Sequence, residues 1–179
     1  MQLPPFNYSA RLDDTAPDFA PRMFVLARHG DVAGLKSHLE QGLSANLLDR
    51  KGDSLVMVAA YHGHAAAVEV LLAHHADPNA RNSNGQTPIA GASFKGHLAV
   101  VQALLKYGAD VEGASPQGQT ALMIAAMFNR ADIVTLLLEH GADVRARSDN
   151  GSTAIEAARA LGAPDAVAIL AEQLAKTRG

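Results

Sequence analysis

The chain repeats itself with a period of 33 residues, and this period limits the possible folds more than any other feature of the sequence. The segment 82–114 reads NSNGQTPIAGASFKGHLAVVQALLKYGADVEGA, and its main features return in the segments before and after it. At this spacing the turn glycines are Gly52, Gly85, Gly118 and Gly151. A period shared by many positions is the signature of a stacked repeat protein, in which each unit contacts only its neighbours.

Each full unit predicts a short first helix. The full units are residues 49–81, 82–114 and 115–147, and each carries a hydroxyl side chain where it can cap a helix N-terminus. These capping residues are Ser54, Thr87 and Thr120. The helix should run for about nine residues before a turn residue stops it. The stops are Gly63, Gly96 and Asn129, since Gly and Asn tolerate a left-handed backbone.

A second helix and a hairpin complete each unit. The second helix is apolar at positions such as Leu71 and Leu72 and at their equivalents in the later units. Gly108 and Gly141 end it in two units, whereas His75 takes this place in the first full unit and is expected to be a weak point. Such short helices are marginal alone in water, so each must bury its apolar side against the next unit.

The two ends of the repeat array are expected to be caps. Residues 20–48 hold a degraded copy and residues 148–179 a last copy with polar ends, as required of units that face water on one side. The polar end residues are Glu172, Gln173, Lys176 and Arg178. Residues 1–19 are proline-rich and predict an extended arm. This arm either packs on the first unit through Phe6, Tyr8 and Phe19 or stays mobile.

The pattern resembles the ankyrin repeat family over about residues 20–179. The motifs that carry the resemblance are Gly85-Gln-Thr87-Pro88-Ile, Gly96-His97, Leu104-Leu105 and Gly108-Ala109-Asp110. The resemblance implies an all-α solenoid of about five repeats including the caps, with paired antiparallel helices and hairpin fingers on one edge. It also implies a concave face that commonly binds proteins. The family usually has a linking histidine three residues after its threonine, but here that column holds Met57, Ala90, Met123 and Glu156.

Helix geometry places a row of apolar side chains on the inner face. Met57 and Tyr61 lie four residues apart and point away from Ala59, so they share one face. The same relation pairs Ala90 with Phe94 and Met123 with Met127. An apolar row open to solvent is typical of a partner site, although the same side chains could simply pack on one another.

The candidate partner-binding set joins this row to its neighbours and to the first finger tip. It comprises Met57, Tyr61, His62, Ala90, Phe94, Lys95, Met123, Met127, Phe128, Arg50 and Lys51. The finger tips change from basic, at Arg50 and Lys51, to acidic at Asp149. Such a gradient could orient a partner of opposite polarity, although solvated turn residues are the commoner explanation.

Other classes of function find little support in the sequence. The net charge of −3 lacks the basic excess of nucleic-acid binders, and no apolar run is long enough to span a membrane. With no cysteine and no suitably spaced carboxylates, the eight histidines do not form a metal set. No catalytic motif is present. We therefore expect no catalytic residue, no metal ligand and no cofactor.

The sequence favours a non-enzymatic protein-binding module, monomeric by itself, with a protein partner. One alternative is an inhibitor or immunity protein that covers a partner enzyme or toxin. Another is a histidine-based metal or haem accessory protein. The composition, with 35 alanines and ten arginines to five lysines, suggests a GC-rich bacterial source. The N-terminus does not resemble a signal peptide, so we expect a cytoplasmic location, or a periplasmic one if a signal was removed earlier.

Overall fold

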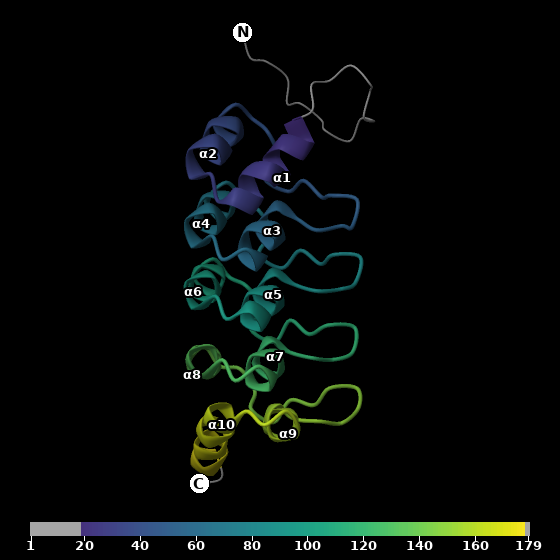
Figure 1. The fold of residues 1–179 in the computed structure, drawn as a ribbon, viewed down its shortest axis with the longest axis vertical. Helices are drawn as coiled ribbons and strands as arrows, with labels where there is room; N and C mark the ends of the chain where they lie inside the picture. The colour runs from purple at the N-terminus through teal and green to yellow at the C-terminus, as the bar shows by residue number, and fades with distance from the viewer. Residues whose placement is uncertain (1–18, 178–179) are drawn as a thin grey trace.

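The computed structural model describes residues 19–177, which form ten helices stacked in five pairs (Figure 1). The inner helices, which lie next to the fingers, are α1 Phe19–His29, α3 Leu55–Tyr61, α5 Pro88–Lys95, α7 Ala121–Met127 and α9 Ala154–Ala160. The outer helices are α2 Val32–Glu40, α4 Ala65–Ala73, α6 Leu98–Lys106, α8 Ala131–Glu139 and α10 Pro164–Lys176. This arrangement confirms the all-α solenoid. Phe19 begins α1, and the rest of the expected arm lies outside the described residues.

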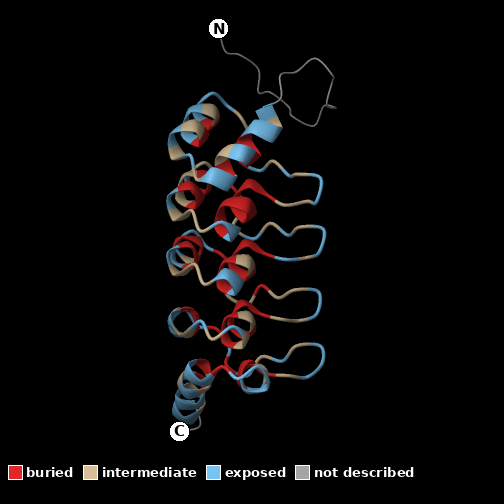
Figure 2. Ribbon diagram, in the orientation of Figure 1, coloured by how far each residue is buried: buried red, intermediate tan, exposed pale blue. Residues whose placement is uncertain are grey.

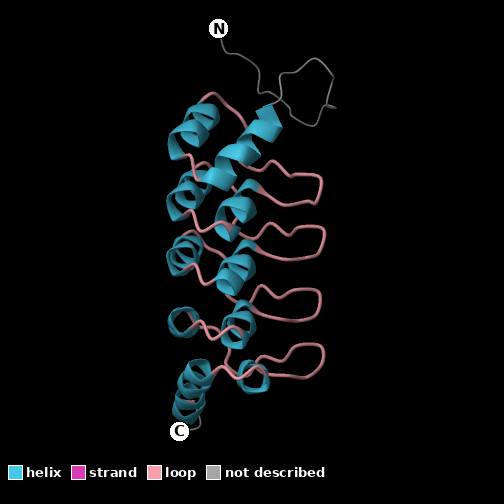
Figure 3. Ribbon diagram, in the orientation of Figure 1, coloured by secondary structure: helices cyan, strands magenta, loops and turns pink. Residues whose placement is uncertain are grey.

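Four fingers project from the side of the inner helices (Figure 3). We number them by the loops that lead from each outer helix to the next inner helix. Finger 1 is residues 41–54, finger 2 is 74–87, finger 3 is 107–120 and finger 4 is 140–153. In the described residues they contain turns and one isolated bridge, between Leu48 and Ser54, rather than regular strands.

The inner helices from α3 onward begin as the hydroxyl column predicts. The side chains of Ser54, Thr87, Thr120 and Thr153 each accept a hydrogen bond from the backbone N–H three residues later. These four residues are buried, so the caps satisfy donors that water cannot reach. Helices α3, α5 and α7 have 7, 8 and 7 residues, slightly fewer than the nine expected, because the cap residues themselves lie outside the helical conformation.

At the ends of α1, α3 and α5, the glycine that stops the helix lies close to a side chain of the next unit. Gly63 and Gly96 both have φ 83, as expected. A Cβ on Gly63 would also lie 2.8 Å from the ring of His97 in the next unit, so backbone strain and lack of space both require glycine. The ring Nε2 of His97 in turn lies 3.2 Å from the carbonyl oxygen of Tyr61, which ties the two units together.

Asn129 shows how this junction can be exchanged for another. It has φ 52, as expected for a residue that takes the place of glycine. The next unit has Ala163 where the others have His64, His97 or Arg130, so the asparagine side chain has room. Its amide donates to Asp165 Oδ2 at 2.9 Å and accepts from the N–H of Ala166 at 3.0 Å. Asn129 and Ala163 thus replace the glycine and the long side chain as a pair.

A continuous core runs between the two layers of helices (Figure 2). Leucines of the outer helices and alanines of the inner helices are fully buried at the same place in successive units. They are Leu71, Leu104 and Leu137, with Ala59, Ala92, Ala125 and Ala158. The small alanine side chains let adjacent inner helices approach closely, while the leucines supply most of the buried apolar area.

We expect the substitution His75→Gly to stabilise the fold. His75 ends α4 with φ 65, a conformation that costs a residue with a Cβ roughly 1 kcal/mol. At the equivalent Gly108 and Gly141 a Cβ would meet nothing within 4 Å, so the strain comes from the backbone and not from crowding. The urea midpoint should rise. In the control Asn129→Gly, the relief of backbone strain is offset by the loss of two hydrogen bonds. An equal rise of the urea midpoint in this control would contradict the explanation.

We also expect Ser93→Ala to stabilise the fold, by about 1 kcal/mol. The Ser93 hydroxyl is fully buried and has no hydrogen-bond partner. Ala60 and Ala126 occupy the same position in the neighbouring units and are also fully buried, so alanine fits there. Thermal unfolding measures the effect. Ser54→Ala is the contrasting variant, because it removes a cap and should lower the melting temperature. A fall for Ser93→Ala would disprove the argument.

Candidate functional site

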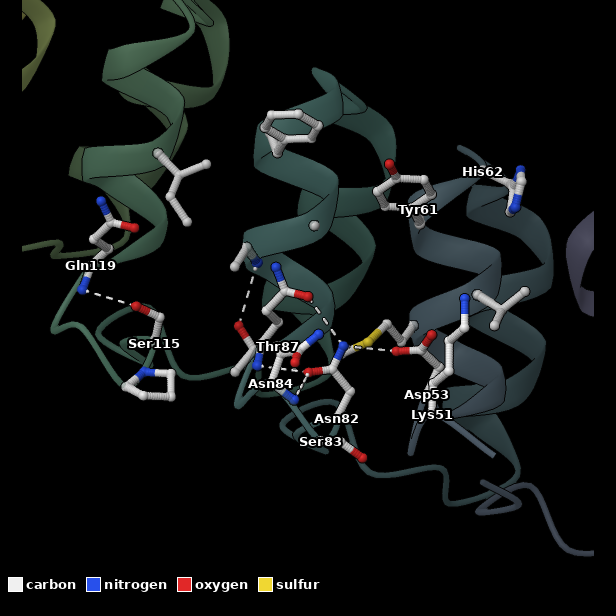
Figure 4. Close-up of a pocket in the computed structure, with 18 of the residues that line it drawn as sticks. Lys51, Asp53, Tyr61, His62, Asn82, Ser83, Asn84, Thr87, Ser115 and Gln119 are labelled. Atoms are coloured by element: carbon white, nitrogen blue, oxygen red, sulfur yellow. Dashed lines mark hydrogen bonds between the residues drawn. The ribbon is translucent and has the colours of Figure 1, made fainter. Parts of the chain in front are cut away.

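A groove of about 1040 Å³ lies between the inner helices and the fingers. Its lining comes from α3, α5 and α7, from fingers 1 to 3, and from Arg28 at the end of α1. Figure 4 shows Tyr61 and His62 together at the last turn of α3, with Asp53, Asn82 and Thr87 at the opposite end of the helices, near the fingers. The groove therefore crosses several units and has an upper edge of helix ends and a lower wall of finger residues.

Side-chain hydrogen bonds fix the shape of the finger wall. Asp49 Oδ1 accepts from the N–H groups of Lys51 and Asp53, at 2.8 and 2.9 Å. Asn82 in finger 2 repeats this arrangement and also donates to Asp53 Oδ1 at 2.8 Å. Because each polar side chain closes its own turn, the wall is rigid before any partner arrives.

Backbone hydrogen bonds join the fingers except where proline removes the donor. The N–H of Ser83 donates to the carbonyl of Lys51 at 3.1 Å, and the N–H of Asp149 donates to that of Gln117 at 3.0 Å. Pro116 occupies the equivalent position between these two links and has no N–H. The carbonyl of Asn84 therefore lacks the link that its counterparts Lys51 and Gln117 have.

The upper edge carries three aromatic rings connected by contacts with one another and with a lysine, and we call these four residues the aromatic ladder: Tyr61, Lys95, Phe94 and Phe128. The Lys95 ammonium lies 4.5 Å from the centre of the Tyr61 ring and 5.9 Å from that of Phe94. The rings of Phe94 and Phe128 meet edge to face at 4.6 Å. Such contacts hold the rings in place at little cost to their exposure.

The structure separates the predicted apolar row into an exposed part and a buried part. Tyr61, Phe94 and Phe128 are 43%, 38% and 41% exposed, as expected for a contact surface. Met127 is half-buried and lines the groove. The first residues of the three predicted pairs are Met57, Ala90 and Met123. The expectation that they are open to solvent is wrong, because they are only 7%, 6% and 2% exposed.

Depth along the helix axis explains this correction. Residues four apart do share a face, but they are separated by about 6 Å along the axis. The earlier residue of each pair lies in the first turn, beside the finger wall, whereas the later one lies at the exposed helix end. Met57 and Ala90 still line the groove, at its floor.

Sequence reasoning missed Arg28, although the repeat period could have revealed it. Arg28 lines the groove and stands 33 residues before Tyr61, in the same column as Phe94 and Met127. The degraded pattern of the first unit obscured this relation. Lys51 also lines the groove, whereas Arg50 and Lys95 are exposed without being part of its lining.

His62 lies among positive charges. Burial of its ring and the charges of Arg28, His64, Lys95 and His29, in that order, lower the pKa of His62 below its ordinary value. Its ring stacks on that of His64 at 6.4 Å and meets that of Tyr61 edge to face at 5.8 Å. Arg28 and Lys95 carry full positive charges beside it, so this end of the groove is positive.

Five of the eight histidines have a backbone carbonyl as a side-chain partner. His64 and His97 each contact a backbone carbonyl of the preceding unit, and His29, His38 and His140 contact carbonyls of their own helices. Among residues 19–177, no group of three or more His, Asp or Glu side chains could hold a metal ion. These contacts give no support to a histidine-based metal or haem role.

Stacked helix pairs, projecting fingers and a groove across several units define a solenoid of the helix-pair repeat class. A family model described as ankyrin repeats in three copies matches residues 23–115 and 111–178. These matches cover most of the chain, which belongs to the ankyrin repeat family. Ankyrin repeats generally serve as protein–protein interaction modules, and the family is generally non-enzymatic.

A curated relative from Pseudomonas aeruginosa is likewise named as an ankyrin repeat protein, PA3287. It is 53% identical over 48 residues, which make up 27% of this chain and 28% of the relative. The match thus spans less than a third of either protein. A bacterial relative agrees with the composition of the chain. Within the described part of the chain, no helix is long and apolar enough to cross a membrane.

The lowered pKa of His62 predicts a pH-dependent loss of stability. The folded protein binds this proton less readily than the unfolded chain, so stability falls as the pH drops through about 6.5, the ordinary histidine value. We expect His62→Gln to lose less stability than the wild type between pH 8 and pH 5.5, measured by urea unfolding. His74→Gln, outside the groove, serves as the control. Identical pH profiles for wild type and His62→Gln would rule out the effect.

Proposed function

We propose that the protein is a non-enzymatic binding module that holds part of a partner protein in the groove. The observation that carries this proposal is the aromatic ladder, exposed along the edge of a groove whose opposite wall is already ordered. Aromatic side chains of this kind contribute much of the binding energy at protein interfaces.

Preorganisation supports a rigid mode of recognition. The finger turns are closed by their own hydrogen bonds, and Lys95 bridges the rings of Tyr61 and Phe94. Little conformational entropy is therefore lost when a partner docks, and more of the contact energy remains as affinity. We expect the partner to meet the ladder first with an apolar side chain, while the exposed finger residues form a polar rim.

The hydroxyl groups along the inner helices favour a non-enzymatic role. Ser54, Thr87 and Thr120 are buried and engaged as helix caps. Each accepts a hydrogen bond from a backbone N–H, and within the described residues none has a hydrogen bond to a histidine. A nucleophile needs both exposure and an adjacent base such as histidine.

The test is affinity purification from the native organism followed by measurement with the purified partner. The double variant Tyr61→Asp with Phe94→Asp should recover less of the partner. Its dissociation constant for the partner should rise at least about tenfold, since two anchor rings are lost. The matched control is Val25→Asp with Tyr107→Asp, which changes two exposed apolar side chains outside the groove.

Equal loss in the two double variants, or loss in neither, would contradict a role for the groove. Circular dichroism should show that both double variants remain folded. The identity of the recovered partner then distinguishes a scaffold from an inhibitor of an enzyme or toxin.

A further inference from the structure

We propose that the groove takes an extended acidic segment of its partner protein, with carboxylate side chains at the α1–α3 end and an apolar side chain against the Phe94 and Phe128 rings. This inference rests on the proposed function and adds the chemistry of the occupant. Arg28 and His62 line the groove at the α1–α3 end, and His29 and Lys95 lie next to them in the sequence columns. We call these four residues the cationic end.

Within residues 19–177, the cations of this region form no ion pair with an acidic side chain. In residues 19–177 the ion pairs are Lys36–Glu40, Lys106–Glu69, Arg147–Glu156 and Lys176–Glu172. All lie away from the groove lining. Arg28 and Lys95 are both exposed and belong to none of these pairs. Within the described part of the chain, two full positive charges therefore remain available to a ligand.

The two carboxylates that do line the groove are already engaged at the finger wall. Asp49 accepts the N–H groups of its own turn, and Asp53 accepts from the Asn82 amide. Asp53 lies near the fingers, at the opposite end of the helices from His62 (Figure 4). The cationic end is thus separated from the acids of the groove, and a carboxylate from outside is the group that complements it.

The apolar site follows directly along the helix ends. Positions 28, 61, 94 and 127 form one column of the repeat and hold Arg, Tyr, Phe and Met. The adjacent column, at 29, 62, 95 and 128, holds His, His, Lys and Phe. Both columns change from basic to apolar in the same direction. The groove therefore has a polarity, and a partner segment with an acidic and an apolar part fits it in one orientation.

Repeat geometry gives the spacing of those two parts. Adjacent packed helices are roughly 8–10 Å apart. The cationic end centres on α3 and the Phe94–Phe128 pair lies between α5 and α7, about one and a half helix spacings further on. At about 3.3 Å per residue of extended chain, this distance corresponds to roughly four residues.

The backbone hydrogen bond that is missing between fingers 2 and 3, at Asn84 and Pro116, also suits an extended segment. Asn84 and Pro116 both line the groove, and the Asn84 carbonyl has no N–H opposite it in the next finger. A backbone N–H of the partner could donate to this carbonyl, as strands do when they add to an unpaired edge.

Selection from a phage-displayed library of random dodecapeptides, with the full-length chain as bait at pH 7, tests this inference. We expect enrichment of peptides that carry Asp or Glu and, about four positions away, an aromatic or aliphatic residue. For one selected peptide, fluorescence anisotropy should show about tenfold weaker binding to Arg28→Glu. Arg22→Glu makes the same charge change on α1 outside the groove lining and should bind like the wild type.

A charge swap and a change of pH sharpen the test. Replacing the acidic residue of the peptide with lysine should restore binding to Arg28→Glu and weaken binding to the wild type. The original peptide should bind the wild type more tightly at pH 6 than at pH 8, since protonation of His62 adds to the charges of Arg28 and Lys95. His62→Gln should reduce this difference.

The outcomes separate this inference from the proposed function. Selected peptides without acidic enrichment, bound equally by wild type and Arg28→Glu but lost in Phe94→Asp, would overturn the acidic specificity and leave the groove as the binding site. Peptides that bind equally well to Tyr61→Asp with Phe94→Asp would overturn both. A library that yields no enrichment over an unrelated bait would overturn the peptide specificity.

Discussion

The stack depends on one recurring junction between units. At this junction, the side chain of the residue just before an outer helix contacts a backbone carbonyl at the end of the inner helix of the preceding unit. His64 contacts the carbonyl of Arg28, His97 that of Tyr61, and Arg130 that of Phe94. The described helices, of 7 to 13 residues, would be marginal alone in water. The junction orients each new pair of helices so that its leucines and alanines enter the core. Because it uses the last carbonyls of the inner helix, it also fixes the helix ends that form the upper edge of the groove.

A second set of links joins the ends of the outer helices, and it tolerates replacement more easily. Asn46 and Asn79 each bridge to the next unit, donating to the carbonyl of His75 or Gly108 and accepting from the N–H of Asp77 or Asp110. Glu112 takes over this column with a carboxylate that accepts from Asp143 but cannot donate. The repeat therefore keeps its register when one bond is lost, because the junction at the inner helices still holds.

The repeat period predicted the caps and turns that depend on local backbone conformation. The hydroxyl caps, the left-handed stops at Gly63, Gly96 and Asn129, and the strained His75 all follow from the needs of a single residue and its backbone. The period could not predict how deep a side chain lies, since depth depends on the neighbouring finger as well as on the helix face. Met57 and Tyr61 share a face and differ greatly in exposure for this reason. Arg28 was missed because the first unit has lost most of the residues that mark the register.

In a regular stack, equivalent residues of successive units lie in a row. The order of side chains along the groove therefore follows from the sequence of each column. In the columns of Ala59 and Leu71, substitution would disturb packing between units, so these columns stay uniform from residue 49 onward. The columns of Tyr61 and His62 lie at helix ends that the junction has already fixed through the backbone, so their side chains can differ from unit to unit without disturbing the stack. They change from basic at Arg28 and His29 to aromatic at Phe94 and Phe128. Since the units share a similar backbone, the difference between the two ends of the groove comes from these side chains. A partner therefore meets basic side chains at one end and aromatic side chains at the other.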